Sequence, residues 1–112
     1  MIKASFKLSA QNEALSFELS GHSGAAESGK DIVCAAVSGA VQTVIAVLDG
    51  QMGFTECFSV RDDEENSVFC DISALKGEDR KIAGTVLKGF KILMEEWEKD
   101  FPKNIKLNIT TV

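Results

Sequence analysis

The chain has 112 residues, of which 45% are hydrophobic and 26% are charged, and its formal net charge is −5. This length and composition are typical of one ordinary globular domain, so we expect a single domain spanning residues 1–112. The acidic balance argues against direct nucleic-acid binding, because a nucleic-acid binder of this size normally carries a basic face.

The first twenty residues predict a β-hairpin. Apolar and polar side chains alternate along residues 2–9 and again along 15–20, which is the period of a half-buried strand. The polar link AQNE at 10–13 joins the two runs, so we expect them to pair. The small residues that follow at 21–30 are typical of a mobile loop.

A helix is predicted from Ile32 to Leu48. Asp31 is a good N-cap, because its carboxylate can accept a backbone N–H of the first turn. No side chain from Ile32 to Leu48 is charged, so we expect this helix in the middle of the fold, ending at Gly50 and Gly53.

The second half of the chain predicts two strands, a helix and a final strand. The runs ECFSVRD and SVFCDIS are joined by the acidic link DEEN, and apolar residues alternate again at 105–109. Pro102 ends the helix between them. The apolar stripe of that helix has spacings of three and four residues: Ile82, Val86, Phe90, Leu93, Trp97 and Phe101.

The predicted element order is therefore ββαββαβ. Hairpins joined through helices indicate the α+β class, with two helices packed on one face of a mostly antiparallel mixed sheet. The order of the strands in that sheet is not predicted.

The cysteine count favours a reducing compartment. Cys34, Cys57 and Cys70 make an odd number, and the N-terminus lacks the apolar block and cleavage site of a signal peptide. No run reaches 18 consecutive apolar residues, so we expect a cytoplasmic protein without a membrane partner. A disulfide between Cys57 and Cys70 is a minor alternative. One histidine and scattered cysteines have no metal-ligand spacing, and we expect no metal and no cofactor.

The segment GAAESGK has the G-x-x-x-x-G-K spacing of a phosphate-binding loop. That motif needs Ser or Thr after Gly-Lys to hold magnesium, and Asp31 stands there instead. A carboxylate would repel phosphates, and such loops belong to parallel sheets. Nucleotide binding is therefore disfavoured.

A thiol catalyst is the stronger interpretation of the same region. With Asp31 as N-cap, Cys34 lies in the first helical turn, a position that favours thiolate. His22, the only histidine, precedes it by twelve positions across a loop long enough to fold back. An imidazole near a thiolate can serve as general base and acid in acyl transfer. Ser38 lies one turn after Cys34 on the same helix face. The alternative is that Cys34 is a small packing residue, as most cysteines in apolar helices are.

The residues around this pair resemble the signature of the ribosomal-processing cysteine protease family (Prp). The matching positions are Gly21-His22, Gly29, Asp31 to Ala35, and Val37-Ser38. The predicted hairpins, the second helix and the last strand also fit, so the resemblance covers essentially the whole chain.

The resemblance implies a cysteine endopeptidase that removes a short N-terminal extension, apolar and aromatic at the cleavage site, from a bacterial large-subunit ribosomal protein during ribosome assembly. It also implies a homodimer, with Cys34 as nucleophile, His22 as general base and acid, and Gly21, Asp31 and Ser38 as supporting residues. For Asp31 we favour capping over orienting His22.

The segment 23–30 is expected to be a mobile loop beside the predicted dyad. We expect the loop to close over a bound peptide, as a glycine-rich lid would. Its residues are Ser23, Gly24, Ala25, Ala26, Glu27, Ser28, Gly29 and Lys30.

The main alternative function is a non-enzymatic ribosome-associated binding module with a structural cysteine. A thiol redox sensor is weaker, because no resolving cysteine lies close in sequence.

Overall fold

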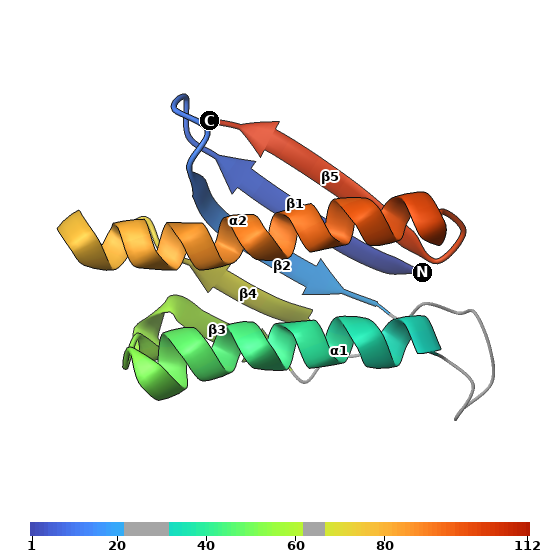
Figure 1. Cartoon of the computed structure of the whole chain (residues 1–112), viewed down its shortest axis with the longest axis horizontal. Helices are drawn as coiled ribbons and strands as arrows, with labels where there is room; N and C mark the ends of the chain where they lie inside the picture. The colour runs from blue at the N-terminus through green and yellow to red at the C-terminus, as the bar shows by residue number, and fades with distance from the viewer. Residues whose placement is uncertain (22–31, 62–66) are drawn as a thin grey trace.

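The computed structural model describes residues 1–21, 32–61 and 67–112, and its elements follow the predicted order (Figure 1). A short π-helical segment, η1, extends the first helix, and a 3-10 turn, η2, precedes the third strand. The elements are β1 (Ile2–Leu8), β2 (Ala14–Ser20), α1 (Ile32–Ile45), η1 (Ala46–Gln51), η2 (Thr55–Cys57), β3 (Phe58–Arg61), β4 (Ser67–Asp71), α2 (Gly77–Asp100) and β5 (Ile105–Thr111).

The five strands form one mixed sheet in the order β3-β4-β2-β1-β5. Three of the neighbouring pairs are antiparallel, and only β1 and β5 run parallel. Figure 1 shows α1 and α2 side by side over the same face of this sheet. The predicted α+β architecture is therefore confirmed, and the strand order is a new result of the structure.

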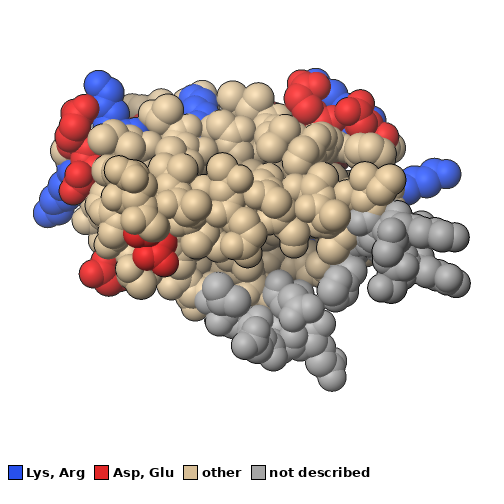
Figure 2. Space-filling model, turned by 60° about the horizontal axis from the view of Figure 1, so that its bottom comes forward, with Lys and Arg blue, Asp and Glu red and all other residues tan. Residues whose placement is uncertain are grey.

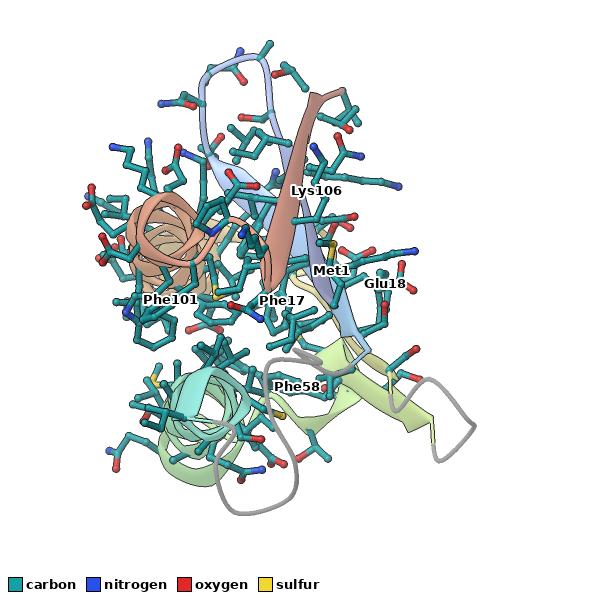
Figure 3. The ribbon with its side chains drawn as sticks, turned by 90° about the vertical axis from the view of Figure 1, so that its right-hand side faces the viewer. Met1, Phe17, Glu18, Phe58, Phe101 and Lys106 are labelled. Carbon is teal, nitrogen blue, oxygen red and sulfur yellow. The ribbon has the colours of Figure 1, made fainter. Side chains whose placement is uncertain are left out.

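The core lies between the sheet and the two helices. Phe6 of β1, Phe17 of β2 and Phe90 of α2 form an aromatic cluster with ring centroids 5.1 to 5.9 Å apart. Tilted and edge-to-face arrangements of this kind are the favourable ones for aromatic rings. In Figure 3, Phe17 lies toward the helices, whereas Glu18 lies on the opposite, open face of the sheet.

The prediction that α1 lies in the middle of the fold is wrong. Its buried residues, Val33, Val37, Val41 and Val44, form one stripe, while Ile32 at its start is 77% exposed. A two-layer fold covers a helix from one side only, so the opposite face remains at the surface. Figure 2 looks onto this side of the molecule and shows a broad area without charged side chains, with the charges gathered toward its ends.

Of the two glycines predicted to end the first helix, Gly53 is confirmed and Gly50 is wrong. The helical run continues through Gly50 to Gln51, as η1. It ends where Gly53 takes a positive φ of 75° and donates its N–H to the carbonyl oxygen of Asp49. Glycine suits this conformation because it has no Cβ. Gly53 alone therefore acts as the terminating glycine.

The buried stripe of α2 is rotated by about one residue from the predicted one. The most buried positions are Ala83, Leu87, Phe90 and Met94, whereas Ile82 is 38% and Phe101 is 41% exposed. The predicted Val86, Leu93 and Trp97 are only partly buried. The face of α2 that is buried is the one whose side chains pack against both α1 and the sheet. The periodicity of apolar residues alone does not determine which face this is.

β2 departs from simple alternation at Leu15. Leu8 pairs with Ala14 and Lys7 pairs with Ser16, so Leu15 is an extra residue opposite β1. Ser16 remains on the face of its exposed partners Lys7 and Asp71, as alternation predicts, but it is itself buried, with 5% exposure.

The segment Ile32–Gln51 is long and apolar enough to cross a membrane by length and composition, with a mean hydropathy of 1.9. This is weak evidence for a span, because a helix that packs in a globular core has the same composition. Here the valine stripe of α1 contacts the core, and 28% of that apolar window is buried.

Candidate active site

Cys34 is the third residue of α1, which begins at Ile32. The first turn of a helix has backbone N–H groups without intrahelical acceptors, and the helix dipole is positive there. Both features favour a negatively charged group. The Cys34 side chain is half-buried, so its sulfur is not sealed into the core. This placement agrees with the first-turn position predicted from the sequence.

Cys34 lines a groove of about 340 Å³ between α1 and the sheet. One wall is a stripe of α1 that starts at Cys34 and runs to Ile45, and the other comes from β1, β2 and β4. Among the described residues, the lining positions carry no charged side chain: Ile2, Leu19, Gly21, Cys34, Val37, Ser38, Val41, Gln42, Ile45 and Val68. We call this feature the α1 groove.

Gly21 lines the α1 groove in a conformation that favours glycine. Its φ is +85°, and a Cβ at this position would overlap the carbonyl oxygen of Met1. Both constraints exclude larger residues without a shift of the backbone. The end of β2 is thereby held against the start of β1.

The structure brings together three of the predicted site residues. Cys34, Ser38 and Gly21 all line the α1 groove. His22, Asp31 and the predicted lid at 23–30 lie outside the described residues. Their predicted roles as general base, helix cap and closing loop therefore stay predictions.

The other two cysteines are packing residues. Cys57 is 9% exposed and Cys70 is fully buried. Burial raises the pKa of Cys57, and the charges of Glu56 and Asp71 raise it further. Burial, followed by Cys57 and Asp71, raises the pKa of Cys70 to about 12. Both thiols therefore stay protonated near neutral pH, and neither is in a disulfide.

Sequence reasoning did not identify most of the α1 groove. Its far wall consists of Ile2, Leu19 and Val68, which come from three strands. Alternation places Ile2 and Leu19 on the inner face of the sheet, but only the register shows that Leu19 lies beside Val68. Within residues 1–21, 32–61 and 67–112, no three His, Cys, Asp or Glu side chains are grouped so that they could hold a metal ion.

Comparison with known proteins points to one family. The model of the family described as cysteine protease Prp matches residues 1–106. The ribosomal processing cysteine protease Prp of Bacillus subtilis (strain 168) is 31% identical over 116 residues, with complete coverage of both chains.

Two crystal structures have the same fold. SMU.848 from Streptococcus mutans superposes with a TM-score of 0.80 at 24% identity, covering 100% of this chain and 96% of that one. The ribosomal processing protease Prp from S. aureus, in complex with a covalently linked product peptide, gives 0.78 at 20% identity and covers 98% of this chain and 100% of its own.

Proposed function

The chain belongs to the Prp family of ribosomal-processing cysteine proteases, and from this premise we propose that it is a cysteine endopeptidase that uses a Cys34–His22 dyad. Its proposed substrate is a bacterial large-subunit ribosomal protein with a short N-terminal extension, which it removes during ribosome assembly in the cytoplasm. The proposal follows from family membership and from the position of Cys34 at the start of α1.

The main structural support for the dyad is that the residue before His22 and the residue Cys34 line the same groove. Gly21 and Cys34 both line it, and His22 is the residue bonded to Gly21. Consecutive Cα atoms are about 3.8 Å apart, and this covalent link of His22 to Gly21 supports the proposal that its imidazole exchanges a proton with the Cys34 thiol.

The proposed reaction is acyl transfer through a thioester. His22 takes the proton of the Cys34 thiol, and Sγ bonds to the carbonyl carbon of the scissile peptide. The backbone N–H groups of the first turn of α1 stabilise the oxyanion that forms. The C–N bond then breaks, and His22 returns the proton to the leaving amine. Water hydrolyses the thioester, and the proton it releases restores the thiol.

The supporting residues have separate roles in this proposal. Gly21 holds the chain before His22 in place, because only glycine fits against Met1. Asp31 caps α1, and Ser38 presents a hydroxyl to the α1 groove one turn after the nucleophile. Residues 23–30 close over the bound peptide.

The test is cleavage of the N-terminally extended ribosomal protein, followed by mass spectrometry of the products. The wild type should cleave once, at the end of the extension, while C34A and H22A should lose activity and C34A should keep its stability. We expect C34A to have nearly the same free energy of unfolding as the wild type, because alanine suits a helix and the side chain of Cys34 is only half-buried. Cleavage by C34A would remove the nucleophile assignment. Binding of the ribosomal protein without cleavage would favour the non-enzymatic binding module.

We propose that the active form is a homodimer formed through the uncharged side of the helical layer. The groove between α1 and α2 has a volume of about 270 Å³ and is mostly apolar. The same surface of a second copy can cover it around a two-fold axis without burying charges, which would be costly. The lining residues are Ala40, Thr43, Val44, Val47, Val86, Gly89, Phe90 and Leu93.

A further inference from the structure

Another cavity lies between the tip of the β1–β2 hairpin and the first turns of α2, with a volume of about 210 Å³. Figure 1 shows the β1–β2 connection and the start of α2 toward one end of the molecule, whereas α1 begins toward the other. The cavity is therefore separate from the proposed active site, and we call it the hairpin pocket. Its lining residues are Gln11, Asn12, Glu13, Ala14, Arg80, Lys81, Gly84, Thr85 and Lys88.

The hairpin pocket gathers positive charge in a protein whose net charge is −5. Arg80, Lys81 and Lys88 line it together with one carboxylate, that of Glu13, so three positive charges against one negative charge leave +2. The ion pairs that the described residues form both lie further along α2. None of the pocket cations is neutralised in this way, and a cleft lined mainly by one sign of charge attracts the opposite sign.

The helix leaves space between these cations. Arg80, Gly84 and Lys88 follow one another at intervals of four residues, so they lie on one face of α2. Gly84 has no side chain, and a Cβ there would meet the carbonyl oxygen of Ala14 at 3.7 Å. The helix therefore runs close to the end of the hairpin, and the middle of the pocket stays open.

Hydrogen bonds hold the walls of the hairpin pocket in place. Lys88 Nζ donates to the carbonyl oxygen of Asn12 at 2.9 Å, which ties α2 to the hairpin. Within the hairpin, the hydroxyl oxygen of Ser9 accepts the backbone N–H groups of Gln11 and Glu13. The Lys88 ammonium keeps further N–H donors beside this bond. A preformed site of this kind pays little ordering cost when a ligand binds.

A phosphate group suits this set of donors. The planar guanidinium of Arg80 can bind two phosphate oxygens at once, and the ammonium groups of Lys81 and Lys88 act as point charges. These cations come from positions two turns apart on α2, so they approach a tetrahedral group from different directions. Among the described residues, none that lines the pocket is aromatic, so a nucleobase finds no ring to stack on. The phosphate itself is then the recognised group.

We propose that the hairpin pocket binds a phosphate group, presented by an RNA strand or by a small phosphate ester. The proposal goes beyond the protease function and does not depend on it. An RNA phosphate held here would anchor the chain at the end away from Cys34, so the α1 groove would remain open to a peptide.

The first test measures RNA binding by the full chain. R80Q/K81Q removes two pocket cations and keeps Lys88, which also ties the hairpin to α2. The matched control K99Q/K103Q makes the same change of net charge at the other end of α2. The affinity for a short fluorescein-labelled single-stranded RNA, from anisotropy at low salt, should fall about tenfold or more in R80Q/K81Q and about twofold or less in the control. The slope of log K against log salt should become shallower by about 1.4, since each phosphate contact to a single strand contributes about 0.7.

The second test uses small ligands. Ribose 5-phosphate should shift the amide resonances of Asn12 and Gly84 in the ¹⁵N-labelled protein, and glutarate at equal concentration should shift them less. E13Q removes the one opposing carboxylate of the pocket and should tighten binding of either phosphate probe by about two- to fivefold, the scale of exposed charge pairs. E96Q is its control, because it removes the same charge at the other end of α2. Should R80Q/K81Q unfold, E13Q still tests the pocket.

The outcomes identify the site and its occupant. Dependence of RNA affinity on Arg80 and Lys81 would support the proposal with RNA as the source of the phosphate, whereas a response to ribose 5-phosphate alone would support a small ester. If neither probe responds to the pocket variants, the proposal is wrong. Glutarate binding as tight as that of ribose 5-phosphate would also overturn it, because the pocket would not select phosphate. Cleavage of the isolated ribosomal protein should be the same for R80Q/K81Q and wild type, so a failure here leaves the protease proposal intact.

Discussion

Gly21 lies against Met1 so closely that a Cβ on Gly21 would overlap the Met1 carbonyl oxygen. The contact joins the end of β2 to the start of β1 and fixes the residue that precedes His22. Backbone geometry at the end of β2, outside the helix that holds Cys34, thus contributes to the proposed dyad.

Replacement of Gly21 by alanine should lower both stability and activity. The positive φ and the overlap with Met1 both oppose a Cβ, so we expect a loss of about 1–3 kcal/mol in the free energy of unfolding, measured by denaturant titration. Peptidase activity should fall further than stability explains. The matched control is G39A, where a Cβ meets nothing within 4 Å in α1 and alanine should be neutral or stabilising. If G21A were as stable as the wild type, Gly21 would not approach the Met1 carbonyl oxygen as closely as described.

The three thiols should differ in their reaction with iodoacetamide at pH 8. Cys34 is half-buried and lines the α1 groove, so it should be modified in the folded protein. Cys57 and Cys70 should resist, because both are buried and burial raises both of their pKa values. Peptide mapping identifies the labelled residue, and in urea all three should react. Labelling of Cys70 as fast as Cys34 in native buffer would show that the core is not as described.

Stability should decrease above about pH 9 through Cys70. Its pKa is raised from 9.0 to about 12, so in that window the unfolded chain loses a proton that the folded protein keeps. The free energy of unfolding then falls with pH, by at most about 1.4 kcal/mol per pH unit for this one group. The comparison is between wild type and C70A in urea titrations from pH 8 to 11. C70A should be less stable at pH 8, but its free energy of unfolding should fall less steeply with pH than that of the wild type. Equal slopes for the two proteins would show that the Cys70 thiol does not cause the loss of stability.

Glu98 should stabilise the edge strand β5. Its carboxylate accepts the backbone N–H of Leu107 at 2.6 Å in a partly buried position. E98A should cost about 1–3 kcal/mol in the free energy of unfolding, since a hydrogen bond to a charged group is lost. E96A is the control, because Glu96 forms only an exposed pair with Lys99, which contributes little. If E98A and E96A lower the free energy of unfolding by similar amounts, the hydrogen bond between Glu98 and Leu107 does not stabilise β5 as expected.

The homodimer should dissociate when a charge enters the groove between α1 and α2. T43E places a carboxylate there, and sedimentation velocity should change from dimer to monomer while circular dichroism stays constant. T85E is the matched control, because both threonines donate their hydroxyl to the carbonyl four residues earlier but Thr85 lies outside that groove. A monomeric wild type would refute the dimer. Co-flotation of that monomer with lipid vesicles would instead assign the uncharged surface to membrane contact.

Much of the fold and part of the candidate site could be predicted because the signals are local. The alternation along Ile2–Leu8 and the position of Cys34 in the first turn of a helix depend only on neighbours in the chain. The order of elements and the α+β class follow from such signals. The partly wrong predictions, such as the central position of α1 and the buried stripe of α2, are those that depend on what each helix packs against.

The sequence by itself determined where the strands and helices form and that a cysteine stands at the start of a helix, because hydrogen bonding and periodicity act within a few residues. Only the tertiary structure decided that Leu19 and Val68 become neighbours and that Ile45 joins them above the sheet. The physical reason is that strand register and helix packing minimise the free energy of segments far apart in the chain. The α1 groove exists only where those segments meet.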